Sequence, residues 1–104
     1  MRLRTIALPS GLESIGDSAF YNCYSLANLS IPASVESIAS KAFSGCKGLG
    51  YIKFEPSVPP ALGGADVFTD VPTDCKILVP EGTLSAYTSA ENYPSSSTYT
   101  YEEY

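Results

Sequence analysis

The stretch "SIGDSAFYNC" at residues 14–23 returns 23 residues later as "SIASKAFSGC" at residues 37–46. The two stretches share serine, isoleucine, alanine, phenylalanine and cysteine at the same places, and most of the differing positions are polar. Two copies of one structural unit diverge in this way when only their inward-facing positions are constrained. The chain is therefore expected to be built from a repeat of about 23 residues.

The repeat extends beyond these stretches, because an offset of 23 aligns residues 3–25 with residues 26–48. A segment of the form L-x-x-L-x-L opens each unit: "LRTIAL" at 3–8, "LANLSI" at 26–31 and "LGYIKF" at 49–54. Units of about 20–29 residues with this core are typical of leucine-rich repeats. Stacked coils bury their apolar rows together, so these segments are expected to form parallel strands along one face.

Each strand is expected to be followed by two shorter elements. A second apolar pair, Leu12 with Ile15 and later Val35 with Ile38, predicts a short extended segment on the opposite face. The segments "GDSAF" and "ASKAF" then predict a single helical turn, capped by Asp17 or Ser18 in the first coil and by Ser40 in the second. The alanine and phenylalanine of each turn, Phe20 and Phe43 above all, are expected in the core.

The third coil is irregular and is expected to close the solenoid. Pro59 and Pro60 cannot donate hydrogen bonds to a ladder, so the second-face segment is expected to end there. A strand at 76–79 follows the strand at 51–54 at an offset of 25, and residues 83–91 predict a closing helix with Thr83 as its cap. The last ten residues, 95–104, are expected to form a loose tail, with an edge strand at "TYTY" (98–101) as the alternative.

The motif LxxLxIPxxVxxIxxxAFxxCxxL over residues 3–54 resembles the BspA-like leucine-rich repeat of bacterial surface proteins. "CKILVP" at 75–80 and "AY" at 86–87 follow in that family's usual order, and Tyr93 stands near the place of its common tryptophan. The resemblance implies a cell-surface or secreted setting, adhesion, and attachment to host or matrix proteins.

These patterns together predict an α/β solenoid: a right-handed coil with parallel strands, single-turn helices and a C-terminal capping helix. One leucine-rich repeat domain is expected at residues 1–94. It comprises regular coils at 3–25 and 26–48, an irregular coil at 49–80 and the capping helix at 83–91.

Composition excludes several classes of function. The net charge is −5, which makes nucleic acid an unsuitable partner. No run approaches the roughly 18 apolar residues of a spanning helix, and the basic N-terminal stretch lacks the apolar core of a secretion signal. The chain contains no histidine, the usual base for serine or cysteine nucleophiles. We therefore predict neither an enzyme nor a cofactor or metal site.

Cysteine and aspartate residues offer two alternatives to that conclusion. Cys23 and Cys46 occupy equivalent positions one coil apart, near enough to suggest a disulfide. Side chains in one column point in parallel, whereas a disulfide needs converging ones, so buried thiols are favoured. The aspartates at 66, 70 and 74 are evenly spaced but match no calcium loop, and are interpreted as turn residues and caps.

The outward face of the strands remains as the candidate binding surface. Alternation along each strand predicts two outward columns, Thr5, Asn28, Tyr51 and Lys76 beside Ala7, Ser30, Lys53 and Leu78. The residues expected to contact a ligand are Asn28, Ser30, Tyr51, Lys53 and Lys76. Tyrosine is enriched in binding surfaces because it combines a large contact area with a polar tip.

Two functions follow from this interpretation. The first is a non-enzymatic adhesion module that binds a protein or a glycan through the strand face. The alternative is a purely structural cap or stalk segment of a longer repeat protein. Leu3, Ile6 and Leu8 would form an uncovered first strand, which predicts fraying, further coils upstream, or an edge-mediated dimer.

Overall fold

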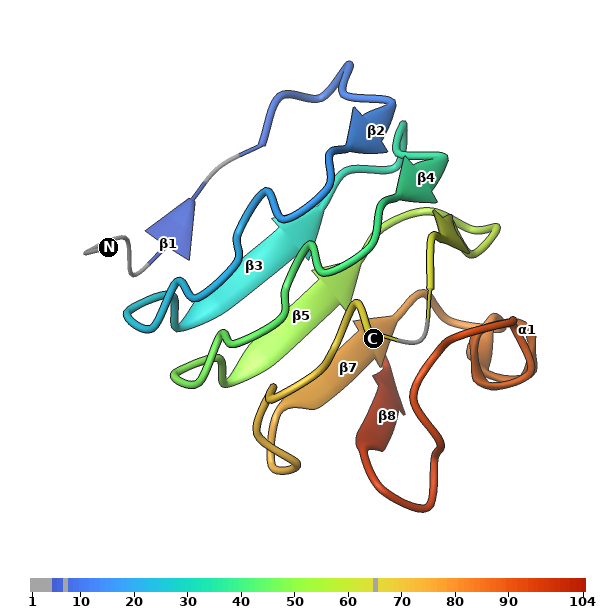
Figure 1. The fold of residues 1–104 in the computed structure, drawn as a ribbon. Helices are drawn as coiled ribbons and strands as arrows, with labels where there is room; N and C mark the ends of the chain where they lie inside the picture. Colours follow the sequence, from blue (N-terminus) through green and yellow to red (C-terminus); the bar gives the residue numbers. More distant parts are fainter. Residues whose placement is uncertain (1–4, 7, 65) are drawn as a thin grey trace.

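The computed structural model of the chain describes residues 5–6, 8–64 and 66–104 (Figure 1). The chain winds into a parallel-strand solenoid of about four turns, as the repeat predicted. Leu3 and Ala7 lie outside the described residues, and Thr5 and Ile6 are described by their backbone alone.

The larger sheet runs the length of the solenoid. Its strands are β1 (Thr5–Ile6), β3 (Asn28–Ile31), β5 (Tyr51–Phe54), β7 (Lys76–Val79) and β8 (Thr100–Glu103), in that spatial order and all parallel. Asn28 pairs with Tyr51, and Tyr51 pairs with Lys76, so the predicted offsets of 23 and 25 are confirmed. Leu29, Ile52 and Ile77 form one buried row.

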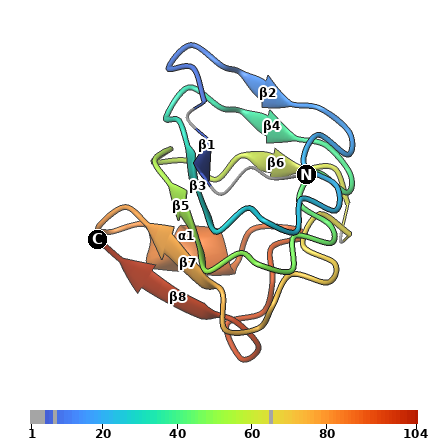
Figure 2. The ribbon, with the colours of Figure 1, turned by 90° about the vertical axis from the view of Figure 1, so that its left-hand side faces the viewer.

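A second, three-stranded sheet covers the opposite face, in the order β2 (Ser14–Ile15), β4 (Ser37–Ile38) and β6 (Ala61–Leu62) (Figure 2). The prediction that this segment ends at Pro59 and Pro60 was wrong. The ladder resumes directly after the prolines, where the N–H groups of Ala61 and Gly63 donate to the carbonyls of Glu36 and Ile38.

The predicted single-turn helices are wrong as well, because residues 16–22 and 39–45 form hydrogen-bonded turns instead. Alternate N–H groups bond in two directions. In the first coil, those of residues 19, 21 and 23 donate three residues back, whereas those of residues 18, 20 and 22 donate to carbonyls of the next coil. The second coil repeats this where the Phe43 and Gly45 N–H groups bond to Val67 and Thr69. The turns thus stack as a third ladder.

Left-handed backbone positions explain why no helix forms there. Ser18 and Lys41 have φ values of 57° and 61° at equivalent places in successive coils. A second equivalent set, Asn22, Gly45 and Asp70, has φ values of 58°, 79° and 64°. A right-handed helix cannot continue through such residues, and Asn, Gly and Asp are the residue types that tolerate them best.

Aromatic rings form the centre of the core. The ring centroids of Phe20 and Phe43 lie 5.9 Å apart at an interplanar angle of 20°, so the predicted stack is confirmed. Phe68 of the third coil extends it at 5.7 Å from Phe43. The alanines of the two turns differ, because Ala42 is buried as expected and Ala19 is exposed. Ala19 belongs to the first coil, which the described residues cover on one side only.

The described residues contain one helix, α1 (Leu84–Thr88), inside the range predicted for the cap. Its capping role stays a prediction. Thr83 at its N-cap makes no side-chain cap hydrogen bond and donates instead to the carbonyl of Pro80. The carboxylate of Glu103 takes over part of that task, because its Oε2 accepts from the N–H groups of Gly82 and Leu84 at 3.1 Å each.

The C-terminal segment differs from the expected loose tail. Residues 100–103 form β8, paired in register with all four residues of β7. The expectation rested on the Ser-, Thr- and Tyr-rich composition of residues 95–104, and it failed because the four residues of β8 find an open parallel edge on β7. The edge-strand alternative was nearer, although the strand begins at Thr100.

Five tyrosine hydroxyl groups stabilise the closing region, residues 83–104: four bond to the third coil, and one, that of Tyr101, bonds within the region itself. Each donates to a backbone carbonyl: Tyr87 to Pro56, Tyr93 to Pro60, Tyr99 to Val71, Tyr101 to Pro94 and Tyr104 to Phe54. Tyr93 also packs against Phe54, Phe68 and Tyr87, with centroids 5.6–6.5 Å away. A tyrosine thus fills the last packing layer where the resemblance implies a tryptophan.

Candidate binding face

The strand face consists of the two outward columns of the larger sheet. The register places Asn28 beside Tyr51 and Tyr51 beside Lys76 in the first column. In the second column, Ser30 lies beside Lys53 and Lys53 beside Leu78. The structure therefore brings all five sequence-predicted residues onto one surface, with Tyr51 and Lys53 on its middle strand.

Tyr51 and Asn28 lie in the part of this face that the closing region does not contact. Tyr51 is 37% exposed, and Asn28 is half-buried beside it. Among the described residues, none forms a hydrogen bond or ring contact with the Tyr51 side chain. A phenol ring with its hydroxyl in solvent, next to an amide, can give a partner both apolar area and hydrogen bonds.

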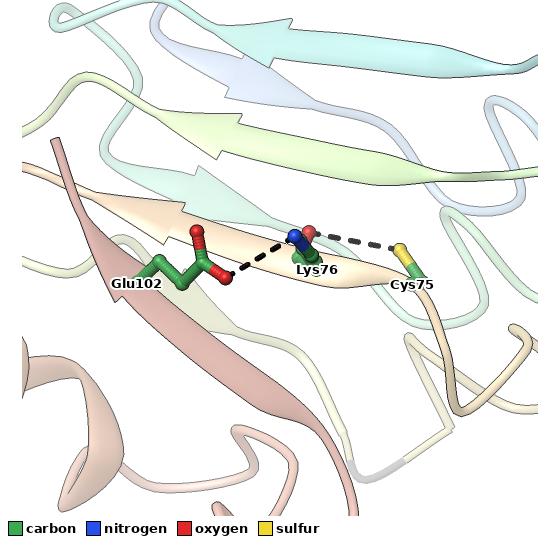
Figure 3. A network of polar contacts seen from close by, with 3 residues as sticks. All are labelled: Cys75, Lys76 and Glu102. Atoms are coloured by element: carbon green, nitrogen blue, oxygen red, sulfur yellow. Dashed lines mark hydrogen bonds and ion pairs between the residues drawn. The ribbon is translucent and has the colours of Figure 1, made fainter.

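Lys76 forms an ion pair with a residue of β8. Its Nζ lies 3.3 Å from Glu102 Oε2, and the two side chains are 55% and 47% exposed (Figure 3). The same view shows Cys75 turned toward the carbonyl of Lys76, at 3.8 Å from sulfur to oxygen. An exposed ion pair contributes about 0.2–1 kcal/mol, so Glu102 neutralises the lysine without holding it strongly.

Lys53 contacts the aromatic ring of Tyr104. Its Nζ lies 4.6 Å from the ring centroid of Tyr104, within the range of a cation–π interaction. The Tyr104 hydroxyl donates to the carbonyl of Phe54 at 2.6 Å, and its N–H donates to the carbonyl of Val79. Tyr104 therefore reaches across β7 to β5, and both lysines of the strand face contact the closing region.

Sequence reasoning missed the residues that β8 adds to this face. Thr100 extends the first column and Glu102 the second, because they pair with Lys76 and Leu78. The signal was available, since the step from Lys76 to Thr100 is 24 residues and lies between the offsets of 23 and 25 already found. The strand was nevertheless missed because β8 adds no row of buried apolar residues: only Tyr101 is half-buried, and its other three residues are exposed.

Cys23 and Cys46 are buried thiols, as favoured, and Cys75 is a third buried thiol. The Cys46 thiol donates to the carbonyl of Phe20 at 3.1 Å. Burial raises the pKa of Cys46 to about 11 and that of Cys75 to about 12, and the nearby Asp74 carboxylate adds to the shift at Cys75. Because the thiolate is the reactive form, these thiols are poor nucleophiles at neutral pH.

The aspartates of the third coil do not form a metal site in the described part of the chain, where no group of three or more potential ligands lies together. Asp70 and Asp74 are exposed at turn positions. Asp66 differs, because its Oδ1 is a buried atom without a hydrogen bond to any described residue.

Three cavities of about 250, 330 and 410 Å³ lie elsewhere. One is next to Pro56–Pro60, one is between Phe68 and the segment 92–99, and one is between α1 and β8. None is lined by the five predicted contact residues. The candidate face is thus a surface outside these cavities, which suits a macromolecular partner better than an enclosed small molecule.

Comparison with known protein families gives one finding that covers most of the chain. A family model described as "BspA type Leucine rich repeat region (6 copies)" matches residues 1–69. Comparison with curated proteins gives no match. In the part of the chain that the structure describes, no helix has both the length and the apolar character needed to cross a membrane.

Proposed function

Because this chain belongs to the BspA-type leucine-rich repeat family, we propose that it is a non-enzymatic adhesion module that binds a protein through its strand face. The repeat family implies a protein-interaction module, is typically non-enzymatic and is commonly surface-associated. We accordingly place the protein at the cell surface or in secreted form.

One observation carries this proposal: Tyr51 stands exposed on the middle strand of the sheet, between Asn28 and Lys76 in one column. Interface hot spots are enriched in tyrosine near the centre of the contact area. The small size of the face argues for a protein whose contact extends past the columns, because a standard interface needs about 800 Å² per partner.

The test is a binding screen of the purified chain against immobilised extracellular matrix proteins, with a glycan array as a separate arm. The double variant Tyr51→Ala/Asn28→Ala is expected to weaken any binding by about tenfold or more, since a hot-spot tyrosine contributes at least about 2 kcal/mol. Outward substitutions usually change stability by no more than about 0.5 kcal/mol, so the variant should fold normally.

Tyr21→Ala serves as the matched control, because Tyr21 is also exposed, at 49%, but lies in the turn of the first coil. Its binding is expected to equal that of the parent. Equal loss in both variants would move the binding surface to the turns, and unchanged binding of the double variant would refute the strand face. Binding confined to the glycan arm would replace the protein partner by a glycan.

The structural alternative, a stalk or cap segment of a longer solenoid, also has an observation in its favour. Within the described residues β1 pairs only with β3, and β2 only with β4, so both sheets can accept another parallel strand at that end. A chain that binds no probe in the screen, but gains stability when further coils are fused before it, would favour this alternative.

A further inference from the structure

The tail, residues 99–104, is attached to the solenoid by polar contacts and by two half-buried tyrosine rings. Its backbone pairs with β7, Glu102 contacts Lys76, and Tyr104 contacts Lys53. The apolar surface buried with these bonds comes from the half-buried rings of Tyr99 and Tyr101, which pack against the core, whereas Thr100, Glu102 and Glu103 are exposed. Elements of this kind open at a lower free energy than core strands do.

The residues that connect this segment to the core have the character of a hinge. All four residues at 95–98 are exposed, and three of them are consecutive serines. Their hydrogen bonds to other described residues are local: the N–H groups of Thr98 and Tyr99 donate to the carbonyl of Ser95, and that of Ser97 donates to the Ser95 hydroxyl. Within the described part of the chain, residues 95–98 therefore make no hydrogen bond to the coils, and the first such bond is that of the Tyr99 hydroxyl to the carbonyl of Val71.

The acceptor surface, in contrast, belongs to the rigid part of the molecule. Ile77 and Val79 of β7 are buried, and β7 pairs with β5 on its other side. Lys53 and Phe54, which receive Tyr104, lie on β5 itself. If the tail leaves, this site keeps its shape and its two positive charges, and it then has an unpaired parallel edge.

We propose that the edge of β7, together with Lys53 and Lys76, is a strand-acceptor site that takes residues 99–104 of a second copy of this chain. Two molecules exchange their tails reciprocally, with residues 95–98 extended as the hinge. The second copy fits because it carries the identical segment, so the exchanged pair regains the four backbone pairings, the ion pair and the Tyr104 contacts seen within one chain.

Exchange would join two small strand faces into one bivalent particle. Linking two binding modules raises overall avidity over that of either module without a new contact to the ligand. This benefit rests on the proposed function, whereas the exchange itself does not, and crosslinking of the tail to β7 measures the exchange alone.

The experiment uses two full-length variants and a short bis-maleimide crosslinker. Leu78 and Glu102 are register partners on β7 and β8, so Leu78→Cys places a thiol on the acceptor and Glu102→Cys places one on the tail. When the two variants are mixed, a crosslinked pair of chains forms where the tail of one molecule lies on β7 of the other. The native thiols are buried and react slowly.

The matched control replaces the acceptor variant with Ser30→Cys, on β3 of the same outward column but separated from β8 by β5 and β7. Random collisions crosslink both mixtures equally. We expect the Leu78→Cys mixture to give at least about five times more crosslinked pairs than the control, increasing with time and protein concentration. Equal yields in the two mixtures, or no pairs in either at millimolar protein, would overturn the proposal.

Discussion

The regular coils and the closing region of this molecule are held together by different means. In the coils, the main packing and pairing contacts recur: the Phe20–Phe43 stack continues to Phe68, and each strand repeats the register of the one before it. In the closing region the contacts occur once each, as tyrosine hydroxyl groups bound to separate carbonyls and as the Glu103 carboxylate near α1.

The difference teaches where a short solenoid is vulnerable. A repeated layer loses stability when its apolar volume is reduced, since each ring packs against rings of neighbouring coils. A closing region built from single polar contacts loses stability when one hydrogen bond is removed, and each loss is smaller. Substitutions in the two regions should therefore differ in size, with the largest effect in the aromatic stack and the smallest at a tyrosine hydroxyl.

Phe43→Ala is expected to have the largest effect, because Phe43 is fully buried between Phe20 and Phe68. Removing a packed phenylalanine ring costs about 3–5 kcal/mol, much of the total stability of a domain this size. Thermal unfolding followed by circular dichroism measures it. A melting temperature within a degree or two of the parent would mean that the coils do not depend on this stack.

Alkaline pH should lower the free energy of unfolding. In the coils the cause is the buried thiols, and in the closing region it is the buried tyrosines. The pKa of Cys46 is raised from 9.0 to about 11, so above pH 9 the unfolded chain releases a proton that the folded chain keeps. The unfolded state then binds fewer protons, and the free energy of unfolding falls with rising pH, by at most about 1.4 kcal/mol per unit for each such group.

Urea titrations at pH 7.5, 9 and 10.5 would measure this fall. Stability from the thiols is fully present below about pH 9 and is lost as pH rises toward 11, and Cys75 extends the fall to about 12. Cys46→Ala should show a shallower slope than the parent. An identical slope would exclude Cys46 as a cause and leave the loss to Cys75 and to the buried tyrosines of the closing region, whose pKa values burial also raises.

Gly45→Ala tests the left-handed turn positions of the coils. Gly45 has φ +79°, and a Cβ there would lie 2.0 Å from the side-chain oxygen of Asn22. Backbone strain with this contact is expected to cost about 1–3 kcal/mol. Gly82→Ala is the matched control, since Gly82 has φ +85° with open space around it and suffers the strain alone. If Gly45→Ala and Gly82→Ala cost the same stability, the Asn22 side chain of the first coil must move aside for the added methyl group.

Tyr93→Phe should have the smallest of these effects on stability. It keeps the ring against Phe54 and removes only the hydroxyl that donates to the carbonyl of Pro60 at 2.8 Å. Loss of one such bond costs about 1 kcal/mol, measurable by urea unfolding with Tyr21→Phe as the exposed control. A cost as large as that of Phe43→Ala would remove the distinction between the two regions.

The same contrast explains what could be predicted from the sequence. Apolar residues at fixed offsets predict the two sheets, the buried rows and the Phe20–Phe43 stack, because each coil repeats the evidence. The offset also predicts which residues share the strand face. The left-handed positions could have been inferred at Asn22, Gly45 and Asp70 from residue type, but Ser18 and Lys41 carry no such signal.

Apart from β8, which follows β7 at a step of 24 residues, the closing region could not be predicted to the same depth, because its side-chain contacts join residues that follow no period. Nothing in the sequence connects Glu103 with the N–H groups of Gly82 and Leu84, 21 and 19 residues away. The contact of Tyr104 with Lys53 spans still more of the chain. Whether the strand face binds a partner remains a prediction, which the variants at Tyr51 and Asn28 test directly.

The ladder of turns has a consequence for how such a protein can change length in evolution. Each coil receives N–H donors from the coil before it and gives donors to the coil after it at matching positions, as Phe20 does with Ala42 and Phe43 with Val67. A tandem duplication of the gene segment for residues 26–48 would therefore insert a coil whose two sides already fit its neighbours. Repeat number can then increase or decrease by whole units while the first coil and the tyrosine-anchored end stay unaltered.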